Sequence, residues 1–154
     1  MWNISFDGVF SREGAGAGVW IIAPKMGSKL HSFKLAFGCT NNEAEYEALL
    51  LGLNLIKDLK VKRISIQGDF GLVLKQVQGA YQDKHPRMRA YKNVVLDLLE
   101  YFSEHKFLVI PREKNSIADA LASTSSTFKI PIHPNKRYEI EVRHRPAMPD
   151  NVKH

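Results

Sequence analysis

The sequence has a single cysteine and no long hydrophobic run. Cys39 is the only cysteine, which excludes an intrachain disulfide and a cysteine-based zinc site. The longest apolar stretch, near residue 50, is far too short to span a membrane, and the N-terminus has no basic-then-apolar signal pattern. These absences predict a soluble intracellular protein, cytoplasmic or nuclear, with no membrane partner.

The composition that remains is that of an ordinary globular protein with an excess of positive charge. The 154 residues are 44% hydrophobic and 25% charged, which is enough for one core and favours one domain. A net charge of +6 and a pI near 9.5 favour a polyanionic partner. A protein that is merely basic is the alternative at this point.

The N-terminal part of the chain has the pattern of three strands. Apolar and polar residues alternate over Trp2–Asp7, an apolar run covers Val19–Ala23, and alternation returns over Lys29–Phe37. Between the first two, Gly14–Gly18 indicates either a flexible connection or a close approach of two backbones. The short connections favour an antiparallel meander.

The spacing of apolar residues then becomes helical. A long, mostly buried helix is predicted from Glu43 to Leu59, followed by a strand over Lys62–Gln67 that ends at Gly68-Asp69. The rest of the pattern predicts four more elements: a short helix at about 71–78, an amphipathic helix over 88–102, a strand over Phe107–Ile110 and a last helix over Ile117–Ser123.

Two helix-start signatures overlap just before the long helix. Thr40 with Glu43, and Asn42 with Glu45, both have the spacing of a capping box, in which a side-chain oxygen and a glutamate satisfy free backbone N–H groups. On this stretch alone, Glu45 is either a capping residue or a residue with a chemical role.

Four acidic residues fall at comparable ends of the predicted elements: Asp7, Glu45, Asp69 and Asp119. If the first and fourth strands are neighbours in a mixed sheet, these side chains can converge at one edge. Clustered carboxylates repel one another, so such a group persists mainly by binding hard divalent cations. Without a His or Cys ligand pattern, magnesium or manganese fits better than zinc. Carboxylates that do not meet would instead indicate an unrelated structural domain.

Four segments in this order resemble type 1 ribonuclease H, and more narrowly the ribonuclease H domain of gypsy-type plant retrotransposon polyproteins. The segments are Phe6–Gly8, Thr40–Leu49, Gly68–Asp69 and Pro111–Ala122, and the likeness covers about residues 2–125. The resemblance implies an α/β, ribonuclease H-like fold. Its five-stranded mixed sheet has three antiparallel strands and then two parallel ones, and it is flanked by about four helices.

The resemblance also implies an activity, the hydrolysis of the RNA strand of RNA–DNA hybrids to give 5′-phosphate and 3′-hydroxyl ends. One of two Mg²⁺ ions, or Mn²⁺, would orient the attacking water while the other stabilises the leaving 3′ oxygen. The residues that match the catalytic and metal-binding positions are Asp7, Glu45, Asp69 and Asp119. A reverse transcriptase domain of the same polyprotein is an implied partner.

Two groups of residues are candidates for binding nucleic acid. Thr40, Asn41 and Asn42 match the family's loop that contacts the nucleic-acid backbone and minor groove. Three cations lie near the N-terminus of the helix predicted at 88–102, where the helix dipole disfavours positive charge. Their position indicates either an external ligand or a solvated basic face. These cations are Arg87, Arg89 and Lys92.

The sequence departs from the family pattern at several positions. The loop before Asp119 has no His, Val9 and Phe10 stand where small or polar residues are usual, and Glu13 stands where many relatives have an Asn. A second hypothesis therefore remains open, a catalytically degenerate ribonuclease H-like module that binds nucleic acid or a partner without cutting it.

The end of the chain differs in composition from the rest. Residues 128–154 hold four of the seven prolines and six Lys and Arg against three Asp and Glu, without a useful helical or strand period. We predict a ribonuclease H-like domain over residues 1–125 and a basic, Pro-containing linker or tail over residues 126–154.

Overall fold

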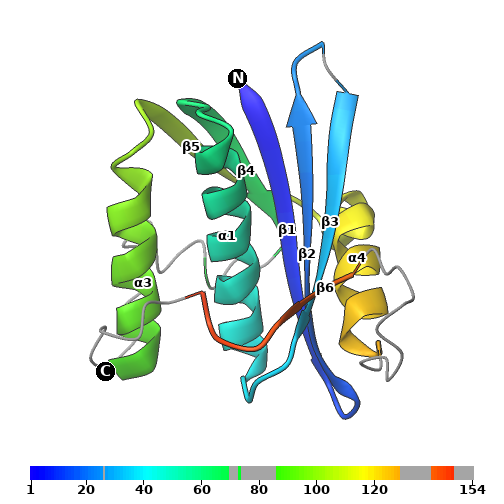
Figure 1. The fold of residues 1–154 in the computed structure, drawn as a ribbon. Helices are drawn as coiled ribbons and strands as arrows, with labels where there is room; N and C mark the ends of the chain where they lie inside the picture. The colour runs from blue at the N-terminus through cyan, green and yellow to red at the C-terminus, as the bar shows by residue number, and fades with distance from the viewer. Residues whose placement is uncertain (26, 70–72, 74–85, 129–139, 148–154) are drawn as a thin grey trace.

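A computed structural model describes residues 1–25, 27–69, 73, 86–128 and 140–147. Its strands form one mixed sheet in the order β5-β4-β1-β2-β3-β6 (Figure 1). In chain order the strands are β1 (Trp2–Ser11), β2 (Gly14–Ala23), β3 (Gly27–Leu35), β4 (Arg63–Gly68), β5 (Glu104–Val109) and β6 (Glu141–Arg143).

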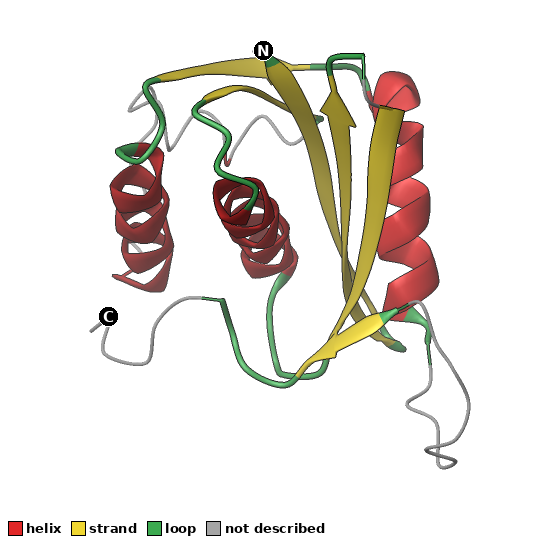
Figure 2. Cartoon of the chain, turned by 45° about the horizontal axis from the view of Figure 1, so that its top comes forward, coloured by secondary structure: helices red, strands yellow, loops and turns green. Residues whose placement is uncertain are grey.

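Helices cover both faces of this sheet (Figures 1 and 2). On one face lies α1 (Asn41–Asp58), with α3 (Pro86–Leu99) packed beside it, and on the other lies α4 (Ser116–Ser126). A 3₁₀ turn, η1 (Arg112–Asn115), leads directly into α4. None of the helices within the described part of the chain is long and apolar enough to cross a membrane.

The predicted order of strand directions is confirmed. β1 pairs antiparallel with β2, and β2 antiparallel with β3, whereas β4 runs parallel to both β1 and β5. The first and fourth strands are therefore neighbours, as convergence of the carboxylates requires.

Two counts in the predicted fold are corrected. The sheet has six strands, because Glu141–Arg143 of the tail adds as β6, parallel to β3, at an edge that the first five strands leave open. Three α-helices lie within the described residues, against about four predicted. The short helix expected at 71–78 falls outside those residues apart from Val73.

The glycine-rich stretch Gly14–Gly18 forms the first half of strand β2, and the close approach of the α4 backbone explains why glycines occur there. A Cβ on Gly16 would overlap the Ala122 carbonyl and a Cβ on Gly18 the Ala118 carbonyl, both on α4. The absence of side chains lets α4 lie directly on β2, which fixes the helix that carries Asp119.

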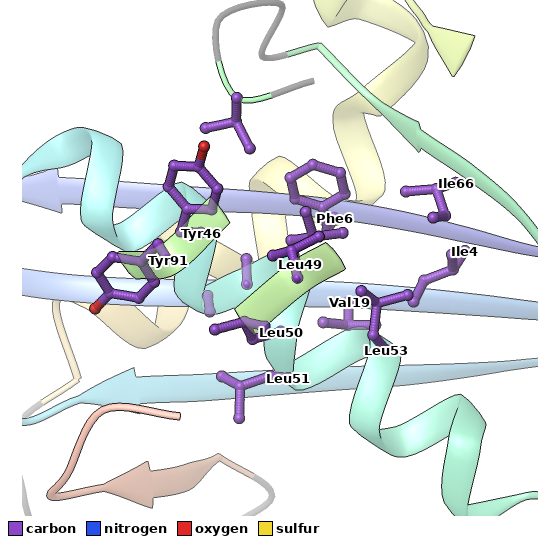
Figure 3. Close-up of a cluster of buried hydrophobic side chains, with 14 of the residues drawn as sticks. Ile4, Phe6, Val19, Tyr46, Leu49, Leu50, Leu51, Leu53, Ile66 and Tyr91 are labelled. Carbon is purple, nitrogen blue, oxygen red and sulfur yellow. The ribbon is translucent and has the colours of Figure 1, made fainter. Parts of the chain in front are cut away.

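The core lies between the sheet and α1. Figure 3 shows Ile4, Phe6 and Val19 of the sheet against Leu49, Leu50 and Leu53 of the helix, and all six side chains are fully buried. Helix α3 joins this core through two stacked rings, Tyr46 of α1 and Tyr91 of α3, whose centroids lie 5.4 Å apart. Burial of this apolar surface anchors α1 rigidly on β1.

Candidate active site

The parallel pairing of β1 and β4 brings two of the predicted carboxylates together. The register pairs Ser5 with Gln67, so Asp7 and Asp69 each follow two residues later on adjacent strands. Asp7 is still within β1 and is buried, whereas Asp69 is the residue after β4 and is partly exposed.

Glu45 reaches the same point because Gly8 has no side chain. A Cβ on Gly8 would overlap the Ala44 carbonyl and the Glu45 amide nitrogen, so only glycine allows the first turn of α1 to lie this close to β1. One carboxylate oxygen from each of Asp7, Glu45 and Asp69 lies within 4.8 Å of the others. The unrelated-domain hypothesis, which predicts that the acids do not meet, is wrong for these three.

Asp119 completes the acidic set from the opposite face of the sheet. It lines the same cleft of about 540 Å³ as the other three carboxylates. In the same cleft, Nη2 of the exposed Arg112 lies 3.9 Å from Oδ1 of Asp119. The remaining lining residues are Gly8, Val9, Phe10, Asn41, Ile110 and Pro111.

The cluster raises the pKa values of its buried members. Burial raises the pKa of Asp7, and the neighbouring Asp119 and Asp69 carboxyl groups raise it further. Burial also raises the pKa of Glu45, together with the charges of Asp7 and Asp69, against a smaller opposing effect of a hydrogen bond from the Gly8 backbone. Without a compensating cation, this cleft favours protonated carboxyl groups.

The site also contains an unpaired oxygen that a cation would satisfy. Oε2 of Glu45 is buried and has no hydrogen-bond partner within the described structure. An unpaired buried oxygen costs about 1–3 kcal/mol and calls for an explanation. An all-oxygen donor set of this kind fits a hard divalent cation such as Mg²⁺, Mn²⁺ or Ca²⁺.

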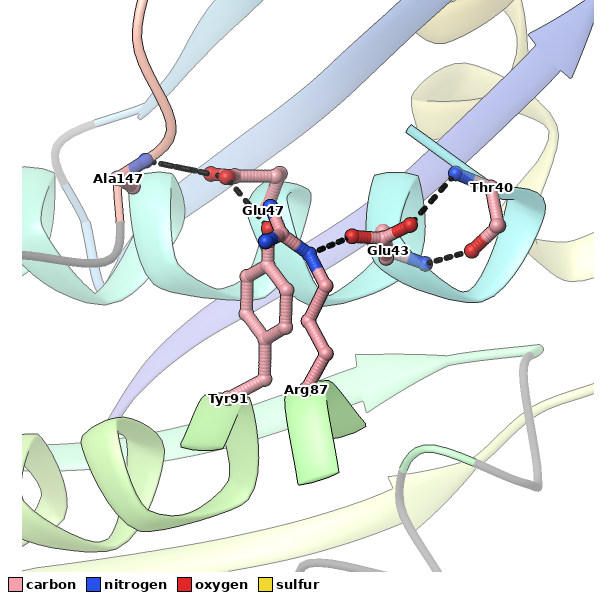
Figure 4. Close-up of polar contacts among 6 residues, drawn as sticks. All are labelled: Thr40, Glu43, Glu47, Arg87, Tyr91 and Ala147. Atoms are coloured by element: carbon pink, nitrogen blue, oxygen red, sulfur yellow. Dashed lines mark hydrogen bonds and ion pairs between the residues drawn. The ribbon is translucent and has the colours of Figure 1, made fainter. Parts of the chain in front are cut away.

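The helix cap is formed by the other overlapping signature, so the capping interpretation of Glu45 is wrong. The Thr40 hydroxyl accepts from the Glu43 N–H at 3.2 Å, and the Glu43 carboxylate accepts from the Thr40 N–H at 3.0 Å (Figure 4). Glu43 also accepts an ion-paired hydrogen bond from Nε of Arg87. These contacts leave Glu45 available to the cleft.

Glu47, two residues after Glu45, lies on the side of α1 that faces α3, away from the cleft. It accepts a hydrogen bond from the Tyr91 hydroxyl at 2.9 Å and one from the Ala147 N–H at 2.7 Å (Figure 4). Burial raises the pKa of Glu47 to about 6, and these two hydrogen bonds oppose that rise. Glu47 therefore ties α3 and the C-terminal segment to α1.

The candidate nucleic-acid contacts are placed differently from one another. Among the described residues, Asn41 lines the carboxylate cleft, but the other five candidates do not. Thr40 caps α1, and Arg87 is engaged by Glu43, with 29% of its side chain exposed. Of the other three, Arg89 is exposed, whereas Asn42 and Lys92 are partly buried.

Three residues at or beside the cleft were not identified as site residues from the sequence. Arg112 occupies the loop where the family pattern offers a His, and Phe10 was visible only as a departure from that pattern. Asn115 is buried, and its side-chain amide donates to the Phe6 carbonyl at 3.0 Å, which ties the start of α4 to the residue before Asp7. No spacing rule in the sequence indicates that contact.

Comparison with known proteins agrees with this geometry. The family described as "Reverse transcriptase-like" matches residues 5–125. Ribonuclease HI of Halobacterium salinarum is 38% identical over 84 residues, which are 54% of this chain and 42% of the relative. The crystal structure of RNase H1 from H. salinarum has a TM-score of 0.75 at 30% identity, covering 80% of this chain and 96% of that one.

A second solved structure, LC11-RNase H1 in complex with an RNA/DNA hybrid, has a TM-score of 0.72 at 30% identity and covers 80% of this chain and 95% of that one. The chain spans less than half the length of the curated H. salinarum relative. The matched region holds all four carboxylates of the cleft. The chain therefore belongs to the reverse transcriptase-like family and is a ribonuclease H-like domain.

Proposed function

We propose that this chain is a metal-dependent endonuclease that hydrolyses the RNA strand of RNA–DNA hybrids. One observation carries the proposal: the three carboxylates whose oxygens lie within 4.8 Å of one another, with an unpaired Glu45 oxygen among them. The related structure that is described as bound to an RNA/DNA hybrid supports the choice of substrate.

The donor set supports two Mg²⁺ ions as the cofactor, with Mn²⁺ as a substitute. Asp7, Glu45 and Asp69 would hold cations at the floor of the cleft, and Asp119 would contribute from the α4 side. Bound there, the ions supply Lewis-acid stabilisation of the phosphate and a lowered pKa for water, as in two-metal phosphodiester cleavage.

The residues of the chain contribute positioning and charge. Rigid packing of α1 and α4 on the sheet fixes the carboxylates before substrate arrives, so little reorganisation is needed during the reaction. Arg112 extends into the cleft beside Asp119, where its guanidinium can pair with a phosphate of the substrate. Cleavage would leave 5′-phosphate and 3′-hydroxyl ends.

We assign substrate binding beyond the four carboxylates to two surfaces. Asn41 is the best-placed member of the Thr40–Asn42 loop, because it already lines the cleft. Arg89 and Lys92 on α3 are the candidates for phosphate contacts at longer range. Arg87 remains a candidate as well, although its guanidinium is engaged by Glu43.

We also propose a biological context and a domain boundary. The motif residues support an origin in a gypsy-type retrotransposon polyprotein, in which a reverse transcriptase domain would be the partner. Residues 1–125 would form the catalytic domain and residues 126–154 a basic tail. Part of that tail is folded onto the domain, since β6 pairs with β3 and Ala147 donates to Glu47.

The test is cleavage of an RNA–DNA hybrid labelled on the RNA strand, with Mg²⁺, with Mn²⁺ and with chelator. We expect RNA cleavage in either metal, none in chelator, and none by the Asp69→Asn variant. A wild-type protein that binds the hybrid without cutting it would favour the degenerate module instead. No cleavage at high enzyme concentration in either metal contradicts the proposal.

A further inference from the structure

Phe10 is a large apolar side chain in an unusual place. It lies near the end of β1, lines the carboxylate cleft, and is 54% exposed. An exposed aromatic ring contributes little to the stability of the fold, and its apolar surface disfavours water. The cleft also holds the four carboxylates of the proposed reaction, together with apolar residues such as Val9 and Ile110, and metal binding by the carboxylates does not account for an exposed ring.

The alternation of β1 determines where this ring lies. Phe6, Gly8 and Phe10 share one face of the strand, the face that α1 covers. Phe6 is fully buried beneath the helix, and Gly8 lies against its first turn. Phe10 is two residues further along, beyond the end of the helix, where Asn41 forms the adjoining wall of the cleft.

We propose that Phe10 is a substrate-contact residue, whose ring packs against a sugar of the hybrid strand that is bound at the carboxylates. This inference rests on the proposed function. A phosphate at the carboxylate floor places the sugars on either side of it next to the cleft walls. The minor groove of an A-form-like duplex is wide and shallow and displays the sugar edges, which an exposed ring can reach.

A sugar fits this position better than a base or a phosphate. A phenyl ring has no hydrogen-bond donor for a phosphate, and stacking on a base requires a strand whose bases are unpaired. In a duplex the apolar C–H face of the sugar is the accessible surface that gains from contact with the ring. Phe10 would therefore set the position of the strand along the cleft without adding charge.

The experiment compares steady-state cleavage of the hybrid by Phe10→Ala, Phe10→Leu, Phe10→Tyr and the wild type. Phe10→Ala should raise KM about five- to tenfold through lost apolar contact, with kcat within about twofold. The KM of Phe10→Leu should lie between those of the wild type and Phe10→Ala, and the KM of Phe10→Tyr, which keeps the ring, should match the wild type. Leu30→Ala is the matched control, because Leu30 is 58% exposed on β3 and does not line the cleft.

The salt dependence of KM provides a second readout that a merely structural role would not produce. Because the contact is uncharged, Phe10→Ala should weaken binding equally at all salt concentrations and leave the slope of log KM against log salt unchanged. An unchanged KM in Phe10→Ala, an equal rise in Leu30→Ala, or a changed slope overturns the inference.

The design separates this inference from the proposed function. If the wild type does not cleave the hybrid, the proposed function fails first. If the wild type cleaves and Phe10→Ala keeps the wild-type KM, only the role of Phe10 fails. Thermal melting of each variant shows whether a rise in KM is caused by unfolding. If Phe10→Ala unfolds, the KM of Phe10→Leu is compared with that of the wild type instead, and an unchanged KM overturns the inference.

Discussion

Three glutamates at alternate positions of α1 have different surroundings. Glu43 and Glu47 are each held by hydrogen bonds to other elements, Glu43 by Thr40 and Arg87 and Glu47 by Tyr91 and Ala147. Glu45 is as deeply buried as they are, yet one of its oxygens has no partner in the described structure. Burial alone therefore does not distinguish a structural carboxylate from a functional one.

The difference between these glutamates agrees with the proposed function, in which α1 carries structural carboxylates beside a metal-binding one. The hydrogen bonds of Glu43 and Glu47 stabilise the fold, because buried acceptors that are satisfied add to stability. The unsatisfied oxygen of Glu45, surrounded by Asp7 and Asp69, reduces stability until a cation neutralises it. A residue that costs stability in this way is expected where function requires it.

The largest expected effect comes from removing the charge of Glu45. Glu45→Gln should lower the rate of hybrid cleavage by at least about 10²- to 10³-fold, since one electrostatic group at a reaction centre is worth that much. The same variant should melt at a temperature equal to or above that of the wild type in chelator, because Gln lacks the carboxyl group whose ionisation is opposed by burial and by Asp7 and Asp69. Single-turnover cleavage and thermal melting measure the two quantities.

Metal-induced stabilisation is the control for this prediction. Mg²⁺ or Mn²⁺ should raise the melting temperature of the wild type, and the rise should be much smaller in Glu45→Gln. Glu43→Gln should retain both cleavage and the metal-induced rise. If Glu43→Gln abolished cleavage while Glu45→Gln did not, the assignment of the cleft would be wrong.

The sequence predicts the carboxylates of the cleft better than it predicts the contacts that hold the surrounding elements in place. The strand end before Asp69 follows from hydrophobic alternation, whereas the predicted strand end at Asp7 is wrong, because β1 continues to Ser11 in its pairing with β2. That the two residues meet follows from the order of the elements. By contrast, both capping signatures have the correct spacing, and only tertiary contacts show that Glu43, with Thr40 and Arg87, forms the cap. Local spacing does not distinguish the two glutamates because both lie in the first turns of the helix.

Long-range contacts account for the rest of what was missed. Apolar and polar residues alternate from Tyr138 to Arg143, although no useful strand period was predicted for the tail, and what this local pattern does not show is that residues 141–143 pair with the open edge of β3. Likewise, Gly14–Gly18 suits either a loop or a strand until α4 is seen to lie on it. In each case the decisive partner is distant in sequence, so a local pattern carries no information about it.

The second-largest effect should come from Glu47. Glu47→Ala leaves the Tyr91 hydroxyl and the Ala147 N–H without their acceptor, so we expect a loss of about 2–4 kcal/mol in the free energy of unfolding. Glu47→Gln keeps one acceptor oxygen and should remain within about 1 kcal/mol of the wild type. Denaturant unfolding measures both losses, and cleavage per folded molecule should be unchanged in each variant.

The pH dependence of stability gives a smaller effect at the same residue. The pKa of Glu47 is raised to about 6 from an ordinary value of 4.5, so the folded state binds this proton more tightly than the unfolded state. Its contribution to stability is complete below pH 4.5 and is lost as the pH rises through about 6. The wild type should therefore lose stability relative to Glu47→Gln over this interval, and the difference should then become constant.

The raised pKa values of Asp7 and Glu45 act in the same direction, but both proteins share them. Comparing the wild type with Glu47→Gln in chelator cancels their contribution, provided that the sites are independent. A difference in unfolding free energy that stays constant from pH 4 to pH 7 would show that Glu47 titrates normally.

The smallest expected effects concern the cations of α3. Arg87 is engaged by Glu43, so Arg87→Ala should cost about 1 kcal/mol of stability and leave the salt dependence of hybrid binding unchanged. Arg89 is exposed and Lys92 partly so, and if each neutralises a phosphate, replacing it by Ala should lower the slope of log K against log salt by about one. Binding measured from low to moderate salt distinguishes the two kinds of cation. A reduced slope in Arg87→Ala would show that Arg87 exchanges Glu43 for phosphate when the hybrid binds, which would remove the contrast between the structural and the functional side of α1.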